Sequence, residues 1–533
     1  MNSMDYRFEV WRAGIISLTS KMKVSNPFLD VVISAEFRGP SGQVILREAY
    51  WDGDDQYKIS FAPTEEGEWR YRINADEKTG LNGCNGIISA LPYTGDKDIY
   101  KHGFIKVSND HHYFVYADGK PFFWLGDTHW EFAYRESWDK SNHPLMKSMF
   151  KGMVDRRVEQ GFTVYQTNLR SDKVMNGDDK YWDSESEEDL PNITFYQNEL
   201  DRRMNYIADS GLVNAIGQAW FMSIDDDIEH QKNLARYIVA RYGALPIVWT
   251  LAGECAGYEG GAVREKRLDG WREVAKTIEK FDGYGHLQTA HYTNERPFAD
   301  YYQDEEWFDF TLNQAGHGDY AISPGDYAEY IAKHGNKPFV EGEALYEFCS
   351  TLEEMGTRLC TADMLRRVAY MTIQLGGCGY TYGAQGIWDV VWDKEQKNPM
   401  ALFNRFGITW AEAIDGPGGY QMGYFKKFYE ENDFEKMIPY RKSDGKNSFS
   451  PFVKKQPFVT ANSDRSKMII YYGDNCNKQI RIDALKDVDY QMKWFDPRTG
   501  EYSDGEVIHP ENGEWTTPKK IADNDWLLIV KEA

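Results

Sequence analysis

Two glutamates, Glu254 and Glu343, each follow a short apolar run that is typical of a buried strand. Hydrolysis of a glycosidic bond needs one carboxylic acid to protonate the leaving oxygen and one carboxylate to face the anomeric carbon. The two carboxyl groups lie about 5–5.5 Å apart when configuration is retained and roughly 6.5–9.5 Å apart when it is inverted. Glu341 competes with Glu343 for the nucleophile's role, because residues two apart in a strand share a face.

The elements that must position these glutamates alternate between short apolar runs and longer amphipathic stretches. Eight strands are predicted, at residues 122–125, 163–167, 213–217, 247–251, 287–290, 308–312, 338–340 and 379–382. Helical spacing of apolar residues occurs at 144–159, 228–242, 264–281, 324–334, 356–375 and 419–432. Eight alternating units predict an α/β protein with a central (β/α)8 TIM barrel rather than an open sheet. No dinucleotide-binding glycine motif follows the first strand to support a dinucleotide-binding fold.

Apolar residues return to a period of two on both sides of the predicted barrel. Residues 1–95 are therefore predicted to form an N-terminal immunoglobulin-like β-sandwich, 96–440 the barrel and 441–533 a C-terminal β-sandwich. The longest insertion, 171–192, is rich in Asp and Glu. Because long insertions tend to block one end of a groove and leave a pocket, we expect exo action on a terminal sugar.

The active site of such a barrel lies at the carboxyl ends of the strands, and these ends are polar here. Asp127 and His129 are predicted to hold sugar hydroxyls, although Asp127 at a strand end is equally suited to capping the next helix. Ring stacking on the sugar or simple core packing are the alternatives for Trp130, Trp220 and Trp388. Further substrate contacts are predicted for Asn168, Gln218, His291, Tyr292, Asn313, Gln314, Glu341 and Tyr382.

Composition limits the partners. A formal net charge of −23 repels phosphate backbones and anionic membrane surfaces, so we expect no nucleic-acid partner. No apolar run reaches the roughly 20 residues that span a bilayer, so no membrane partner is expected either. The aromatic content of 15% favours a carbohydrate ligand, because ring faces suit sugars. Homo-oligomerisation is left open.

The six cysteines have no Cys-x-x-Cys spacing, which argues against a zinc cluster and a disulfide framework. No cofactor and no metal are predicted. The first ten residues lack a basic and then apolar leader pattern, which together with the sparse cysteines favours a cytoplasmic location. A secreted protein with a leader already removed would have the same sequence.

Four segments of the predicted barrel resemble the apiosidase-like family of clan A glycoside hydrolases. They are 123–130 (FWLGDTHW), 248–254 (VWTLAGE), 337–347 (KPFVEGEALYE) and 380–383 (YTYG). The resemblance spans about residues 104–430, and the first 90 residues are similar to the sandwich module that often precedes such barrels. It implies that Glu254 is the acid/base and Glu343 the nucleophile of a retaining glycosidase acting on an apiose-like, arabinofuranose-like or pyranose sugar of a plant-type glycoside.

This sequence departs from those patterns at two places. Gly253 stands where clan A enzymes place Asn, and Glu254 stands where apiosidase-like relatives commonly carry Asp. To act as an acid near neutral pH, Glu254 needs a raised pKa, from burial beside Trp249 or from the charge of Glu343.

Three other functions remain as alternatives. They are an inverting glycosidase, a non-catalytic carbohydrate-binding protein, and a metal-dependent hydrolase that uses His291 and His317.

Overall fold

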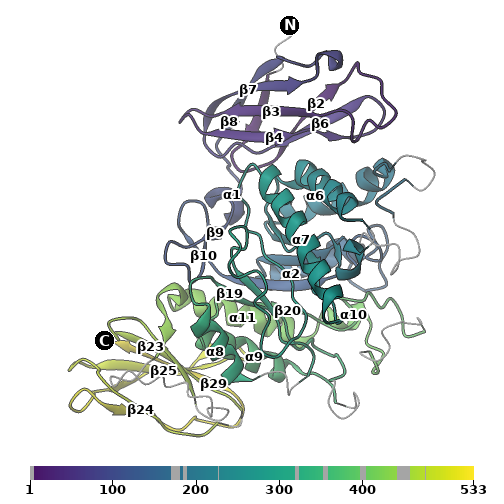
Figure 1. Cartoon of the computed structure of the whole chain (residues 1–533). Helices are drawn as coiled ribbons and strands as arrows, with labels where there is room; N and C mark the ends of the chain where they lie inside the picture. The colour runs from purple at the N-terminus through teal and green to yellow at the C-terminus, as the bar shows by residue number, and fades with distance from the viewer. Residues whose placement is uncertain are drawn as a thin grey trace.

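The computed structural model describes residues 5–169, 180–183, 189–225, 227–318, 323–351, 358–395, 404–440, 457–474 and 476–533. A β-rich N-terminal region, a central sheet covered by helices and a β-rich C-terminal region follow one another along the chain (Figure 1). Most of the acidic insertion predicted at 171–192 lies outside the described residues. The predicted domain boundaries stay predictions.

Two sheets pack face to face in the N-terminal region. The larger has the order β1 (Tyr6–Glu9), β8 (Asn85–Leu91), β7 (Gly67–Ala75), β3 (Ile33–Arg38) and β4 (Val44–Glu48). The smaller has the order β2 (Gly14–Thr19), β6 (Gln56–Phe61) and β5 (Tyr50–Trp51). Alternate residues point into a shared core, where Phe37 stacks on Phe61 with ring centroids 3.9 Å apart.

Seven parallel strands form the curled sheet at the centre of the chain. Their order is β16 (Ile247–Trp249), β14 (Val213–Gly217), β13 (Val164–Asn168), β12 (Trp124–His129), β20 (Gly379–Tyr382), β19 (Phe339–Glu343) and β18 (Thr311–Gln314). These correspond to seven of the eight predicted strands. Side chains on both faces are buried, as the continuous apolar runs indicate.

The strand predicted at 287–290 is not a regular strand. Isolated parallel bridges join Gln288 to Trp249 of β16 and His291 to Leu312 of β18. The carboxylate of Asp309 accepts the backbone N–H of Gln288 at 2.8 Å, so a side chain takes the place of a ladder carbonyl. The segment therefore lies between the two edge strands without continuous pairing.

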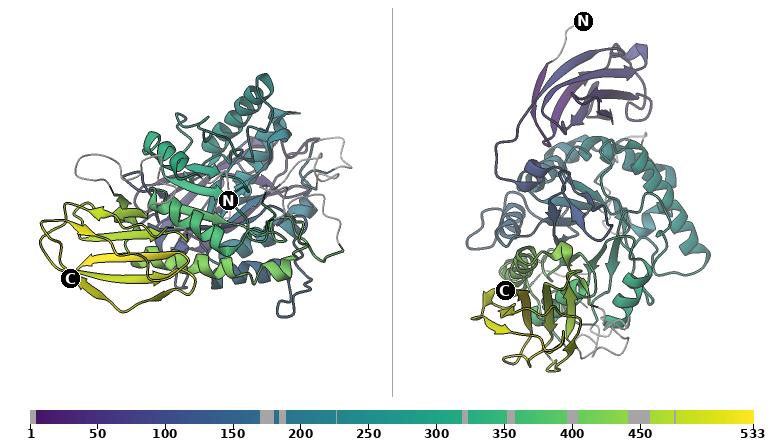
Figure 2. Two further views of the ribbon diagram at one scale, coloured as in Figure 1. Left: turned by 90° about the horizontal axis from the view of Figure 1, so that it is seen from below. Right: turned by 90° about the vertical axis from the view of Figure 1, so that its left-hand side faces the viewer.

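Helices cover the outer face of the curled sheet (Figure 2). The main ones are α2 (Met149–Glu159), α5 (Asp201–Asp209), α6 (Ile228–Tyr242), α7 (Ala262–Phe281), α8 (Pro324–Lys333), α9 (Ala362–Gln374) and α11 (Pro417–Glu431). Shorter elements are α1 (Asp98–His102), β9 (Lys106–Val107), β10 (Phe114–Val115), β11 (Pro121–Phe122), α4 (Ile193–Phe195), β15 (Ala219–Trp220), β17 (Ala252–Gly253) and α10 (Trp410–Ala413). The helices confirm the 3.6-residue pattern, with ends shifted by a few residues.

The C-terminal region is built on a sheet with the order β21 (Ile438–Pro439), β22 (Phe458–Ala461), β23 (Lys467–Tyr472), β29 (Trp526–Glu532), β25 (Tyr490–Asp496) and β26 (Glu501–Tyr502). The strand β27 (Glu506–Ile508) also pairs with β25, and β24 (Arg481–Ile482) pairs with β28 (Trp515–Thr516). Tyr370 of α9 stacks on Tyr471 at 5.2 Å, and Phe428 of α11 packs on Phe495 at 4.6 Å. These contacts join the sheet to the helices of the central region.

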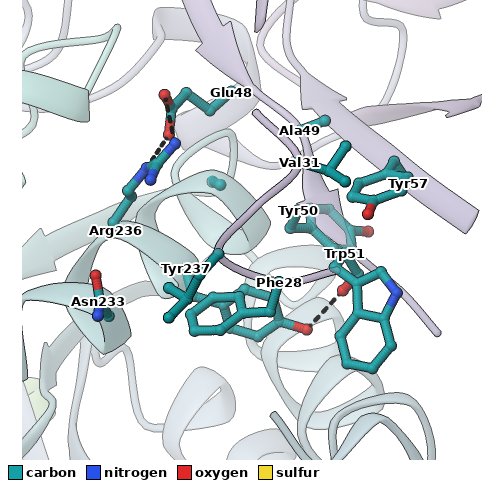
Figure 3. Close-up of a pocket in the computed structure, with 12 residues that line it drawn as sticks. Phe28, Val31, Glu48, Ala49, Tyr50, Trp51, Tyr57, Asn233, Arg236 and Tyr237 are labelled. Carbon is teal, nitrogen blue, oxygen red and sulfur yellow. Dashed lines mark hydrogen bonds and ion pairs between the residues drawn. The ribbon is translucent and has the colours of Figure 1, made fainter. Parts of the chain in front are cut away.

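The N-terminal sheets are held against α6 by polar contacts around a small pocket (Figure 3). Arg236 forms an ion pair with Glu48 at 2.5 Å, and the Tyr237 hydroxyl donates to the carbonyl of Trp51 at 2.9 Å. Nearby, the buried Arg47 donates to two carbonyls at the end of α6, at 2.8 and 3.1 Å. A search of the described residues for a helix long and apolar enough to cross a membrane finds none.

Candidate active site

The two predicted catalytic glutamates lie at or beyond the carboxyl ends of two strands, β19 and β16, that are not adjacent in the seven-stranded sheet. Glu343 is the last residue of β19, and Glu254 directly follows β17, beyond the end of β16. Leu251 and Glu254 have φ angles of 55° and 54°, a left-handed conformation that non-glycine residues rarely adopt. Backbone strain of this kind concentrates at functional sites, where the surrounding fold holds it in place.

Two histidines face the carboxylate of Glu343. His291 Nε2 lies 3.1 Å from Glu343 Oε2, and His317 Nε2 lies 3.1 Å from Oε1. Burial alone would raise the pKa of Glu343, but the two facing imidazoles outweigh burial and lower it to about 2. The backbone N–H of Glu254 donates to His291 Nδ1 at 3.3 Å, so a neutral His291 carries its proton on Nε2, toward Glu343. Glu343 is therefore held as a charged carboxylate.

The environment of Glu254 raises its pKa, whereas that of Glu343 lowers the pKa of Glu343. Burial and, next, the charge of Glu343 raise the pKa of Glu254 above its usual range. Gln314 Nε2 donates to Glu254 Oε1 at 3.2 Å, and the hydroxyl of Tyr258 donates to the same oxygen. The indole N–H of Trp249 donates to Asp282 at 3.2 Å. Two carboxyl groups with divergent pKa values are the arrangement expected of an acid and a nucleophile.

Glu341, the competing candidate, is occupied by other partners. Its carboxylate accepts hydrogen bonds from Tyr327 Oη at 2.5 Å, from Asn313 Nδ2 at 2.6 Å and from the backbone N–H of Ala315 at 3.0 Å. Burial raises the pKa of Glu341 to about 7 in spite of these donors. The saturated carboxylate favours a structural role for Glu341 and leaves Glu343 as the better nucleophile.

A β-bulge at Gly342 explains why Glu341 and Glu343 have different surroundings. Asn313 pairs with Glu341 and the next residue, Gln314, pairs with Glu343, so Gly342 has no partner on β18. A Cβ atom at Gly342 would lie 2.5 Å from a methyl group of Leu312. The bulge breaks the two-residue alternation on which the predicted shared face depended.

Asp127 and His129, predicted to bind sugar hydroxyls, lie instead in a closed cluster with no exposed surface. His129 Nε2 lies 2.7 Å from Asp127 Oδ2, and its Nδ1 lies 2.7 Å from Glu136 Oε1. Arg157 Nε donates to Asp127 at 2.5 Å, and Tyr165 Oη lies 2.8 Å from His129 Nδ1. Partners from outside the strand enclose both side chains, which favours a structural role over contact with sugar hydroxyls.

Most other predicted contact residues are turned toward neighbouring elements. Asn168 donates to the carbonyl of Ala219 at 2.9 Å, and Gln218 donates to the side chain of Gln231 at 2.8 Å. Both side chains are almost completely buried.

The same holds for the two predicted tyrosines. Tyr292 accepts the backbone N–H of Tyr302 at 3.1 Å, and Tyr382 donates to Glu347 at 2.5 Å. Both rings are almost completely buried, with exposed fractions of 1% and 0%.

The structure does bring several predicted residues next to the glutamate pair. His291 and Gln314 contact the carboxylates directly, as described above. The indole of Trp130 packs edge-on against His291 at 5.3 Å and against Trp220 at 5.8 Å. The ring of Trp388 lies 6.2 Å from that of Tyr346. Three tryptophans thus lie in the aromatic surroundings of the site.

Gly253, which replaces the Asn of clan A enzymes, lies under the ring of Trp220. A Cβ atom at Gly253 would come within 2.4 Å of that ring. The indole therefore occupies the space that any larger side chain at this position would need.

Three residues of the site were not among the predicted catalytic and substrate-binding residues, namely His317, Tyr258 and Tyr346. Tyr346 packs on His317 with ring centroids 4.5 Å apart. Burial and, next, the charge of Glu343 raise the pKa of Tyr346 well above its usual range. The nearness of Tyr346 to Glu343 in the chain was the available signal. Among the described residues, no group of three His, Cys, Asp or Glu is spaced to hold a metal ion, and both candidate histidines face Glu343.

Comparison with known families shows which proteins this chain is similar to. The model of the family described as "Apiosidase-like, catalytic domain" matches residues 108–436, more than half of the chain. The chain belongs to the apiosidase-like family. It is accordingly a glycosidase-type enzyme, as the resemblance predicted. Residues 7–76 match a domain of unknown function, DUF5060, and residues 451–531 match a domain described as "Putative collagen-binding domain of a collagenase".

Solved structures of glycoside hydrolases have a similar fold. A "putative glycoside hydrolase" from Bacteroides vulgatus has a TM-score of 0.73 at 17% identity, over 99% of this chain and 100% of that one. A glycoside hydrolase family 5 structure from the same organism has a TM-score of 0.65 at 21% identity, over 83% of this chain and 96% of that one. Among curated proteins, no relative matches this apiosidase-like chain.

Proposed function

We propose that this apiosidase-like enzyme is a retaining glycosidase that removes a terminal sugar, with Glu343 as the nucleophile and Glu254 as the acid/base. The observation that carries the proposal is the opposite electrostatic setting of the two carboxyl groups. Two imidazoles lower the pKa of Glu343, whereas burial and the charge of Glu343 raise that of Glu254. One group is suited to attack and the other to donate a proton at the same pH.

In the first step, a carboxylate oxygen of Glu343 bonds to the anomeric carbon while the bond from that carbon to the leaving oxygen breaks. The proton of Glu254 passes to the leaving oxygen, so that a neutral alcohol departs. In the second step Glu254, now charged, takes a proton from water, and the resulting oxygen attacks the anomeric carbon. The ester bond to Glu343 breaks, which releases the sugar and restores both groups.

The framework around this pair is proposed to be a (β/α)8 barrel whose fifth strand is reduced to the bridges at Gln288 and His291. This proposal is supported by the position of those bridges between β16 and β18, the edge strands of the seven-stranded sheet. Apiose is the first candidate for the sugar because of the family, with arabinofuranose and pyranoses as further candidates in a plant-type glycoside.

The proposal is tested with a panel of aryl glycosides that includes apioside, arabinofuranoside, xyloside, glucoside, galactoside and rhamnoside. Glu254→Ala and Glu343→Ala are each compared with wild type and with the surface control Glu501→Ala. We expect cleavage of one substrate, a loss of at least about a thousandfold in kcat/KM for both site variants and none for the control. Proton NMR of the first sugar released should show the anomer of the substrate. Unchanged activity in either site variant would refute the assignment, and the opposite anomer would refute retention.

A further inference from the structure

Tyr258 is an exposed tyrosine whose hydroxyl points back at the proposed acid. Its side chain is 61% exposed, and the hydroxyl donates to Glu254 Oε1 from four residues along the chain. The second donor to that oxygen, Gln314, is only 4% exposed. Of these two donors, Tyr258 is thus the one on the side open to solvent.

The loop that carries Tyr258 is shaped by glycines and closed by one aromatic contact. Gly257 and Gly261 have φ angles of 66° and 64°, which favour glycine. A Cβ atom at Gly257 would lie 2.8 Å from Phe221, so the loop passes close to that ring. Tyr258 itself packs edge-on against Phe221 with ring centroids 6.1 Å apart. Because Tyr258 is 61% exposed, much of its ring is open to solvent.

Phe221 is fixed by the residues behind it. The guanidinium of Arg267 lies 4.8 Å from the centre of its ring and is itself paired with Asp225 at 2.6 Å. Phe221 and Tyr258 therefore form an aromatic surface next to Glu254, and Arg267 holds Phe221 in place. Flat apolar faces of sugars and aromatic groups bind such surfaces.

We propose that Tyr258 is a positioning residue for Glu254 and that its ring contacts the leaving group of the substrate. The proposal rests on the proposed acid role of Glu254. The proton of Glu254 must reach the leaving oxygen, and the leaving group approaches from the side open to solvent, where Tyr258 lies. A hydroxyl that donates to a carboxylate stabilises its charged form. Tyr258 thus favours the charged Glu254 that must accept a proton from water in the second step.

The first test measures the protonation of Glu254 without turnover. Protein with 13C-labelled glutamate carboxyl groups is titrated by NMR, and Glu254→Gln identifies the resonance of Glu254. We expect Tyr258→Phe to raise the pKa of Glu254 by on the order of one unit, because it removes only the hydroxyl donor. The matched control is Tyr502→Phe, whose hydroxyl donates to the surface residue Glu431 at 3.1 Å. An unchanged Glu254 titration in Tyr258→Phe overturns the positioning role.

The second test separates the ring from the hydroxyl on the aryl glycoside that the wild type cleaves. In Tyr258→Phe, the alkaline limb of the pH profile of kcat/KM should move to higher pH by as much as the pKa of Glu254 rises. The KM should stay nearly unchanged. Tyr258→Ala should raise KM several-fold for an aryl leaving group but not for a methyl glycoside of the same sugar. Equal KM values in Tyr258→Ala and wild type overturn the leaving-group contact. If the wild type cleaves nothing, the glycosidase proposal fails while the NMR titration still decides the positioning role.

Discussion

The buried cluster around His129 predicts a pH-dependent stability that a single substitution removes. Two carboxylates, from Asp127 and Glu136, each lie 2.7 Å from a ring nitrogen of His129, and none of the three side chains is exposed. Burial alone would lower the pKa of His129, but the two carboxylates outweigh it and raise the pKa to about 8. The folded protein therefore holds a proton that the unfolded chain, with a histidine pKa of about 6.5, releases sooner.

The sign and size of the effect follow from linkage. A raised histidine pKa contributes stability that is fully present below about pH 6.5 and is lost as pH rises through about 8. A shift of about 1.5 units corresponds to about 2 kcal/mol of free energy of unfolding. We expect His129→Gln to lose that dependence and to be destabilised at pH 6, since it leaves two buried carboxylates without a cation between them.

The assay is unfolding in urea at pH values from 6 to 9, followed by tryptophan fluorescence. The control is His509→Gln, because His509 also lies between two aspartates, at 2.8 and 3.0 Å, but on the surface, where ion pairs contribute little. The double variant His129→Gln with Glu136→Gln restores the charge balance and should be more stable than His129→Gln alone. The reasoning is refuted if wild type and His129→Gln lose stability equally between pH 6.5 and 8.5.

Three further predictions concern the site and its support. Glu341→Gln should keep kcat within about tenfold of wild type on the cleaved aryl glycoside, whereas Glu343→Gln should lose at least about a thousandfold; the reverse order would make Glu341 the nucleophile. Gly253→Ala should lower kcat/KM and change tryptophan emission by displacing Trp220, and it should add no further loss in a Trp220→Ala background; wild-type activity in Gly253→Ala would contradict the tight contact. Arg47→Met should lower the free energy of unfolding by more than about 2 kcal/mol in urea titrations, because two buried carbonyls of α6 lose their donor. An unchanged urea midpoint of unfolding would show that these hydrogen bonds between Arg47 and α6 do not stabilise the protein.

Periodicity predicted the framework well, because the central strands and helices bury continuous faces. The run 213–217 and the helical pattern 228–242 coincide with β14 and α6. The run 287–290 was also predicted to be a strand, yet the Asp309 carboxylate accepts one of its backbone N–H groups in place of a ladder carbonyl. A side chain that replaces a backbone acceptor leaves no trace in an apolar pattern, so the irregular fifth strand could not be predicted.

Site residues could be predicted where they lie at the ends of predicted strands. They could not be predicted where partners that are distant in the sequence determine what a side chain contacts. Glu254, Glu343, His291 and Gln314 all follow predicted strands, and the structure brings them together. Asp127 also lies at a strand end, but Arg157, 30 residues away in the chain, turns it into a buried ion pair. Hydrophobic periodicity predicts where a strand ends, but it does not predict which helix residue will contact the side chains at that end.

Bulges and loops account for the remaining differences. Glu341 and Glu343 differ only through the bulge at Gly342, which a two-residue alternation does not contain. Tyr258 was overlooked because it lies in a glycine-rich loop after Glu254, where no apolar pattern points to a contact. The hydrogen bond from its hydroxyl to Glu254 depends on the turn that those glycines allow.

The most direct test of the central claim is to trap the sugar on the nucleophile. The enzyme is incubated with a dinitrophenyl 2-deoxy-2-fluoro glycoside of the sugar that it cleaves. The fluorine slows both the formation and the hydrolysis of the glycosyl-enzyme, whereas the activated leaving group speeds only its formation, so the intermediate accumulates. Intact mass should rise by one fluorosugar, and peptide mapping should place the label on Glu343. A label on Glu341, or the absence of any label from an enzyme that cleaves the parent glycoside with inversion, would contradict the account.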